Sequence, residues 1–114
     1  MNELLLLLKK FFGYTRFRPM QEEIIQRIVA GKDALVLMPT GGGKSICFQL
    51  PAIYLPGTAL VVSPLIALMK DQVDRLRQVG LSATCLHVGL SREVMEQRLA
   101  QCVAGQVKFL YVSP

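Results

Sequence analysis

The chain has 114 residues and 52% hydrophobic content, which is enough for one packed domain and too much for an intrinsically disordered segment. Its formal net charge of +5 suits an anionic partner such as nucleic acid without requiring one. The leucine run at residues 4–8 is too short to cross a membrane and lacks a signal-peptide cleavage site, so no membrane partner is expected. The 3 cysteines have no metal-ligand spacing and are predicted to be reduced core residues, which favours a cytoplasmic location.

Two helices are predicted at the start of the chain. Residues 4–8 would form the buried face of the first helix. The second would span residues 20–29, where Met20 and the following isoleucines recur at helical spacing. Pro19 suits the first turn of this helix, and Gly31 suits the position just past its end. We therefore expect an N-terminal helical region.

Further along, short apolar runs alternate with stretches of helical character. The predicted strands are residues 34–38, 60–63, 83–86 and 107–112. The predicted helices begin at Ser45, where Pro51 would end the helix early, at Leu65, and at Ser91, a suitable cap for a helix running to about residue 104. Strands joined by helix-length crossovers predict an α/β fold with a parallel sheet flanked by helices. The segments that follow strands, residues 40–45, 63–65 and 113–114, should line one edge of this sheet.

A phosphate-binding loop is predicted directly after the first of these strands. Its residues are Thr40, Gly41, Gly42, Gly43, Lys44 and Ser45. The glycines let backbone N–H groups point inward, the following helix offers its positive end, and Lys44 brings a charge to the outer phosphates. Ser45 offers a hydroxyl ligand to Mg²⁺. Met38 stands where the general pattern has a glycine, and the alternative interpretation is a merely flexible glycine turn.

A complete site for phosphoryl transfer also needs a carboxylate that holds the magnesium ion. None of the predicted strands ends in Asp or Glu, and the acidic residues on the predicted helices are typical of a solvated surface. His87 is the single histidine of the sequence. It has no Cys, Asp or second His at metal-ligand spacing and is predicted to be an ordinary polar residue. Taken alone, these residues describe a non-catalytic nucleotide-binding or DNA-binding module, and a small-molecule kinase using the same loop is a second alternative.

Three blocks of sequence carry a more specific signature. They are Phe12-Gly13-Tyr14 with residues 17–21, then residues 38–45, then residues 63–73. In this order and spacing the blocks resemble RecQ-type ATP-dependent DNA helicases, most closely the bacterial ones, over nearly the whole chain. The resemblance implies a P-loop NTPase with a RecA-like parallel sheet. Residues 1–32 would be an adenine-reading helical region, and residues 33–114 would be the first part of the RecA-like helicase ATP-binding domain, incomplete at its C-terminus.

The resemblance also implies roles for residues of the first block. Tyr14 would stack on the adenine of ATP, Gln21 would hydrogen-bond the edge of the base, and Arg18 would lie close by. The alternative for Phe12, Tyr14 and Phe17 is that their rings fill the gap between the first two helices.

The same resemblance implies that Lys44 is a catalytic residue that stabilises the β and γ phosphates, with ATP and Mg²⁺ as cofactors. Ser63 and Lys70 would bind the backbone of single-stranded DNA, the alternatives being an ordinary helix cap and a solvated lysine. The intact protein would then be a 3′ to 5′ DNA helicase that acts on single strands and duplex junctions in repair and recombination, in the bacterial nucleoid. Its acidic box would follow Pro114, so the 114 residues alone are expected to be inactive.

Overall fold

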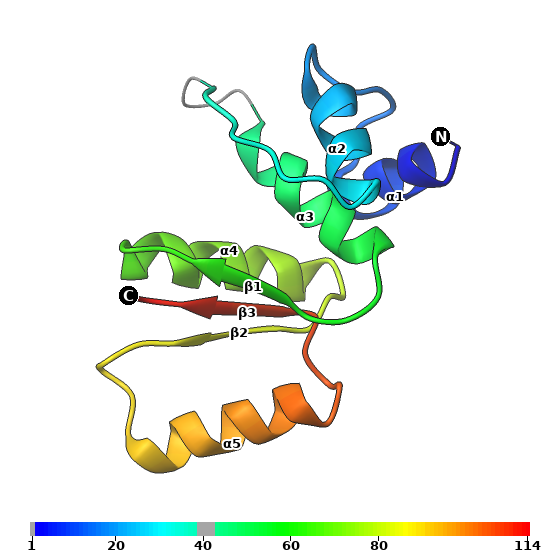
Figure 1. Ribbon diagram of the computed structural model, residues 1–114. Coiled ribbons are helices and arrows are strands. Elements are labelled where there is room, and N and C mark those ends of the chain that lie inside the picture. Colours follow the sequence, from blue (N-terminus) through cyan, green and yellow to red (C-terminus); the bar gives the residue numbers. More distant parts are fainter. Residues whose placement is uncertain (1, 39–42) are drawn as a thin grey trace. The chain divides into compact units, whose positions relative to one another are not determined.

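The computed structural model describes residues 2–38 and 43–114. Its helices and strands are α1 (Asn2–Phe12), α2 (Gln21–Val29), α3 (Lys44–Tyr54), β1 (Ala59–Val62), α4 (Ile66–Gln78), β2 (Ala83–Leu86), α5 (Arg92–Val103) and β3 (Phe109–Val112) (Figure 1). They form two compact units, Met1–Pro56 and Gly57–Pro114. The first unit contains α1, α2 and α3, and the second contains the sheet together with α4 and α5.

Apolar side chains at helical spacing form the core of the first unit. Leu4 and Leu8 of α1 are buried against Ile25 of α2 and Leu50 of α3. Each such burial contributes roughly 1.5–3 kcal/mol to stability. Leu6 lies on the other side of α1 and is 67% exposed. The prediction that the leucine run supplies the buried face of a first helix is therefore confirmed.

The predicted second helix is confirmed as α2, which begins one residue later than expected. Met20 has a left-handed backbone conformation with φ of 73°, so it precedes the helix as its cap and α2 begins at Gln21. Pro19 accordingly lies before the helix, and the Met20 side chain is 62% exposed instead of joining the apolar face. The far end of α2 is as predicted: Gly31 has φ of 82°, and its N–H donates to the carbonyl of Ile28 at 2.9 Å.

The prediction that Pro51 ends the third helix early is wrong. Pro51 lies inside α3 and is fully buried, and the helix continues to Tyr54. A proline inside a helix lacks the N–H that would bond to the carbonyl four residues earlier and its ring crowds that carbonyl, at a cost of roughly 3 kcal/mol, but its fixed φ is compatible with helical geometry. The ring of Pro51 is fully buried in the first unit, and burial of apolar surface is the contribution that opposes this cost.

The predicted strand at residues 34–38 is also wrong, since residues 32–38 form no helix or strand. Leu35 and Leu37 are 90% and 87% exposed. A continuous apolar run indicates only that a segment can pair, whereas a strand exists when a neighbour supplies hydrogen bonds. No strand of the described sheet pairs with this segment.

The second unit is built on a parallel sheet with strand order β1-β3-β2, as the alternating pattern predicted. The central strand β3 pairs with both neighbours in register, so that Ala59, Phe109 and Ala83 lie in one row. Phe109 and Tyr111 of β3 point to one face of the sheet and are 0% and 1% exposed, whereas Leu110 and Val112 on the other face are half-buried.

The helices α4 and α5 lie on opposite sides of this sheet (Figure 1). The helix α4 packs on β2 and β3, and α5 packs on β2. A buried hydrogen bond joins α4 to the central strand: the Tyr111 hydroxyl donates to Oε1 of Gln72 at 2.7 Å. The predicted cap of α5 is confirmed, because the Ser91 hydroxyl accepts the N–H of Val94 at 3.3 Å.

Two arginines cover the outer edge of β2. Backbone groups of successive strand residues point to alternate sides, and the carbonyl of Leu86 accepts a hydrogen bond from the β3 side, so the carbonyls of Ala83 and Cys85 point outward. Arg77 of α4 donates its Nε–H to the carbonyl of Ala83 at 2.9 Å. Arg98 of α5 donates from Nη1 to the carbonyl of Cys85 at 2.5 Å. The outward acceptors of this edge strand are therefore satisfied by side chains.

Candidate nucleotide and nucleic-acid site

The end of the predicted phosphate loop leads directly into α3. Gly43 is the N-terminal cap of the helix, and Lys44 and Ser45 are its first two residues. Lys44 is exposed and Ser45 is half-buried. The first N–H groups of the helix and the positive end of its dipole lie at this terminus, which is the arrangement that binds phosphate. The other predicted loop residues, Thr40, Gly41 and Gly42, lie outside the described residues.

Gln21 joins the predicted adenine-reading segment to the end of the phosphate loop. Its side chain is 2% exposed. Oε1 accepts the backbone N–H of Arg18 at 2.8 Å, and Nε2 donates to the carbonyl of Gly43 at 3.2 Å. One amide thus links the turn before α2 to the residue that precedes Lys44, across 22 positions of sequence.

The backbone at Gly43 has no room for a side chain. Its φ is 82°, and an added Cβ would overlap Nε2 of Gln21. The thiol of Cys47 donates to the same Gly43 carbonyl, with 3.6 Å between sulfur and oxygen. Cys47 is buried, and burial raises the pKa of its thiol. Its part in the loop was missed from the sequence, where the only signal was its position one turn after Gly43.

The aromatic residues of the first block divide into two groups. Phe12 and Phe17 pack against the leucine and isoleucine core of the first unit, as the gap-filling interpretation predicts. Tyr14 is 50% exposed in the turn after α1, so its ring is accessible for stacking. Arg18 is exposed as well.

The carboxyl ends of the strands bring the other predicted segments together. Ser63 follows β1, and its N–H donates to the carbonyl of Val112 in β3 at 3.0 Å. Ser113 follows β3, and its N–H donates to the carbonyl of Leu86 in β2 at 3.1 Å. Residues 63 and 113 therefore share one edge of the sheet, as predicted. Residues 43–45 belong to the first unit, and their place at this edge stays a prediction.

The predicted DNA-contacting side chains lie around the start of α4. The Ser63 hydroxyl accepts the N–H of Leu65, the residue just before α4, at 3.3 Å. A hydroxyl that accepts in this way still carries a hydrogen it can donate to a phosphate oxygen. Lys70 lies in the second turn of α4 and is exposed. The structure therefore places one hydroxyl and one cation at this helix start.

His87 lies at the same end of the sheet, although no role was predicted for it. It follows β2 directly, just as Ser63 follows β1 and Ser113 follows β3. Its Nδ1 accepts the N–H of Gly89 at 3.2 Å. The signal that could have located it is its position immediately after a predicted strand.

Residues 2–38 and 43–114, which the structure describes, contain only part of the predicted magnesium site. Ser45 is the predicted hydroxyl ligand, and no cluster of three or more His, Cys, Asp or Glu residues in this part of the chain could hold a metal ion. A serine hydroxyl fits magnesium as one oxygen ligand among several and cannot hold it alone. None of the described helices is both long and apolar enough to cross a membrane.

Comparisons with known proteins agree with this architecture. Residues 18–114 match the family model of the DEAD/DEAH box helicase. The chain is 54% identical over 107 residues to the ATP-dependent DNA helicase RecQ of Synechocystis sp., covering 94% of this chain and 22% of that protein. It is 44% identical over 109 residues to the RecQ helicase of Bacillus subtilis, covering 95% of this chain and 18% of that protein. The chain thus spans about a fifth of the length of these relatives, and its resemblance to RecQ-type helicases is confirmed.

A solved structure supports the fold independently. The crystal structure of a hypothetical ATP-dependent RNA helicase from Sulfolobus tokodaii superposes with a TM-score of 0.75 at 22% identity, covering 100% of this chain and 34% of that one. At this level of identity the likeness concerns the fold alone. It agrees with the predicted RecA-like α/β class of P-loop NTPases.

Proposed function

This chain belongs to the DEAD/DEAH box helicase family, and we propose that it serves as the ATP-binding and DNA-binding part of a 3′ to 5′ DNA helicase. The observation that carries the proposal is the Gln21 amide, which is buried and bonded to both Arg18 and Gly43. A phosphate loop alone serves many nucleotide-binding enzymes. A phosphate loop tied by a buried amide to an exposed aromatic turn provides contacts for both the phosphates and the base.

Each residue of the nucleotide site has a defined task in this proposal. Lys44 and the start of α3 would bind the β and γ phosphates and stabilise the charge that develops during transfer. Tyr14 would stack on adenine with Arg18 close by, and Gln21 would contact the edge of the base as predicted, in addition to holding the base-binding turn against the loop through its bonds to Arg18 and Gly43. Ser45 would be one ligand of magnesium, which when bound neutralises phosphate charge.

The DNA-binding part of the proposal rests on the strand edge of the second unit. Ser63 would donate to a phosphate oxygen, and Lys70 would add a charge that neutralises the DNA backbone. Action on duplex junctions, repair and recombination, and a cytoplasmic, nucleoid-associated location belong to the same proposal. We also propose that residues 1–32 form the adenine-reading region and that residues 33–114 form the first part of the RecA-like domain.

A second candidate function is a nucleotide-binding module without hydrolysis. It is favoured by one observation, that the described residues contain no acidic cluster for a metal. The two candidates share ATP binding and differ in turnover. A small-molecule kinase would leave Ser63 and Lys70 without a role.

The test of the nucleotide site is ATP binding by the 114-residue chain and its Lys44→Ala variant. Removing a cation from the phosphates should weaken ATP binding by about tenfold or more, equivalent to about 1.4 kcal/mol. Titration calorimetry with ATP measures this directly. Lys32→Ala is the matched control, because Lys32 is an exposed lysine of the same unit that lies after α2. Equal ATP affinity of the Lys44 variant and the unchanged chain would refute the site.

The DNA assignment is tested by the salt dependence of binding to a labelled single strand. Lys70→Ala should weaken binding and reduce the slope of log K against log salt by about 0.7, the value for one phosphate contact on single-stranded DNA. Arg75→Ala removes the same charge from the last turn of the same helix, and it should leave the slope nearly unchanged. Identical slopes for the Lys70 variant and the unchanged chain would remove Lys70 from the interface.

A further inference from the structure

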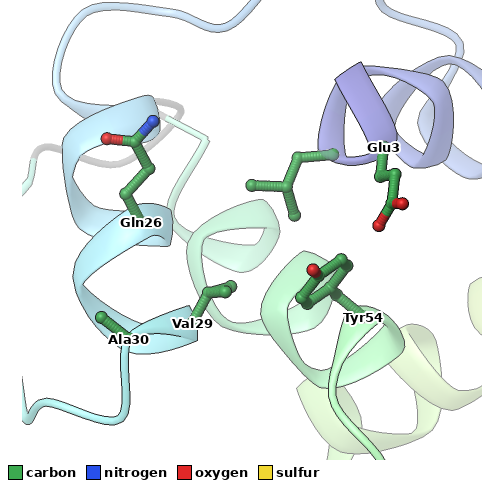
Figure 2. A pocket seen from close by; sticks show the side chains of 6 residues that line it. Glu3, Gln26, Val29, Ala30 and Tyr54 are labelled. Atoms are coloured by element: carbon green, nitrogen blue, oxygen red, sulfur yellow. The ribbon is translucent and has the colours of Figure 1, made fainter. Parts of the chain in front are cut away.

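A hollow of about 250 Å³ lies among the three helices of the first unit (Figure 2). Its lining residues are Glu3, Leu4, Gln26, Val29, Ala30 and Tyr54. They come from the first turn of α1 and from the C-terminal ends of α2 and α3. Lys44 begins α3 and Tyr54 ends it, so the hollow and the proposed phosphate site lie at opposite ends of one helix. Its volume is below the usual range of roughly 300–1,000 Å³ for small-molecule pockets, and it suits one long side chain.

The charges around the hollow favour a cation. Glu3 is the one ionisable carboxylate in the lining, which contains no Lys or Arg. The C-terminal ends of α2 and α3 add the negative ends of two helix dipoles, which outnumber the one positive end that the first turn of α1 contributes. Arg27 is in the last turn of α2, but its Nε–H donates to the carbonyl of Asp33 at 2.6 Å. The charges around the hollow are therefore more negative than those of the chain as a whole, whose net charge is +5.

The apolar part of the lining suits the methylene stem of a long basic side chain. Leu4 and Val29 offer aliphatic surface, and the Tyr54 side chain offers an aromatic ring that is accessible because the residue is 41% exposed. Figure 2 shows the Glu3 side chain pointing toward the Tyr54 end of the hollow. A cation placed there meets a carboxylate and an aromatic ring together, while its stem lies against apolar surface.

We propose that this hollow is a docking site for a lysine or arginine side chain of a partner protein. The carboxylate of Glu3 pairs with the basic head group, and the ring of Tyr54 contacts it through a cation–π interaction. Leu4 and Val29 contact the stem. An acidic partner segment is excluded by the same charges. The proposal uses no residue of the nucleotide or DNA site, so it stands independently of the proposed function.

The experiment is an NMR titration of the 114-residue chain with the capped tripeptide acetyl-Gly-Lys-Gly-amide and its arginine counterpart. Saturable shifts are expected at the backbone amides of Glu3, Val29 and Tyr54, with dissociation constants in roughly the millimolar range for a single side chain. The norleucine counterpart keeps the stem and lacks the charge. It should bind at least about fivefold more weakly than the lysine peptide. Equal binding of the norleucine peptide, or no saturable shift, would overturn the proposal.

Two variants connect the binding to the named residues. Glu3→Gln should weaken the lysine peptide about fivefold while Glu23→Gln leaves it unchanged. Glu23 is the matched control, because it is an exposed glutamate in the first turn of α2 that does not line the hollow. Tyr54→Leu keeps an apolar side chain and removes the ring, and it should also weaken binding, by about threefold. Equal losses for Glu3→Gln and Glu23→Gln would show a general charge effect and refute the site.

Discussion

At the residue scale, Gly43 has two separate reasons to be glycine. Its φ of 82° is unfavourable for other residues, and any Cβ would overlap the Gln21 amide. We predict that Gly43→Ala lowers the free energy of unfolding by about 1–3 kcal/mol more than Gly31→Ala, because it also breaks the buried Gln21 hydrogen bond. Gly31 has the same φ of 82° and no atom within 4 Å of an added Cβ, so it isolates the backbone cost. Urea denaturation of both variants measures the difference, and equal losses would mean that the Gln21 contact contributes nothing.

Cys47 makes stability depend on alkaline pH. Burial raises the pKa of its thiol above the ordinary value of 9.0, so above that pH the unfolded chain releases this proton and the folded chain keeps it. The stabilisation by the protonated Cys47 thiol is fully present below the pKa of this thiol in the unfolded chain. It is lost as the pH rises through the higher pKa of the thiol in the folded chain. We predict that the free energy of unfolding falls from about pH 8 to about pH 10, and that Cys47→Ala makes this fall shallower. Cys102→Ala, which removes a half-buried thiol from α5, is the control for urea denaturation at each pH. A fall of unchanged steepness in the Cys47 variant would contradict the prediction.

At the scale of the elements, the edge of β2 is closed by Arg98 and Arg77. Sheet edges with unsatisfied backbone groups recruit further strands. We predict that Arg98→Ala exposes the carbonyl of Cys85 and makes the chain self-associate at concentrations where the unchanged chain does not. Sedimentation velocity over a range of concentrations measures the effect. Arg92→Ala is the control, because Arg92 lies on the same helix with 93% of its side chain exposed and pairs with Glu96. A monodisperse Arg98 variant would show that this arginine does not protect the edge.

The elements that the sequence predicted well are those set by local patterns. The bounds of β2 were predicted without error, and α5 was predicted from Ser91 as its cap, because both depend on residues within a few positions of each other. The errors arose where distant residues decide. Residues 34–38 form an apolar run of the length of a strand but have no described neighbour to pair with. Pro51 was expected to end α3, and burial within the first unit outweighs its local preference.

At the scale of the whole molecule, the predicted site residues fall into both compact units. The described nucleotide residues lie in Met1–Pro56, and the predicted DNA residues lie in Gly57–Pro114. The ATP and DNA titrations therefore report on different units. Gln21 and Ser63 could be identified as candidates because the spacing of motifs can be read directly from the order of residues in the sequence. It did not reveal the bond from Gln21 to Gly43, the role of Cys47 or the arginine-covered edge, since each depends on which segments meet in space.

The order of strands in the sheet also decides when the second unit can form during synthesis. Its central strand β3 comes last in the chain, and β1 and β2 each pair with β3 rather than with one another. A ribosome therefore releases β1 and β2 long before either can acquire its partner. Until residue 112 has emerged, the nascent chain exposes two unpaired apolar strands, which is the condition in which chaperones bind and aggregation competes with folding. We therefore expect this sheet to complete its pairing only after β3 has emerged, when β3 can insert between β1 and β2.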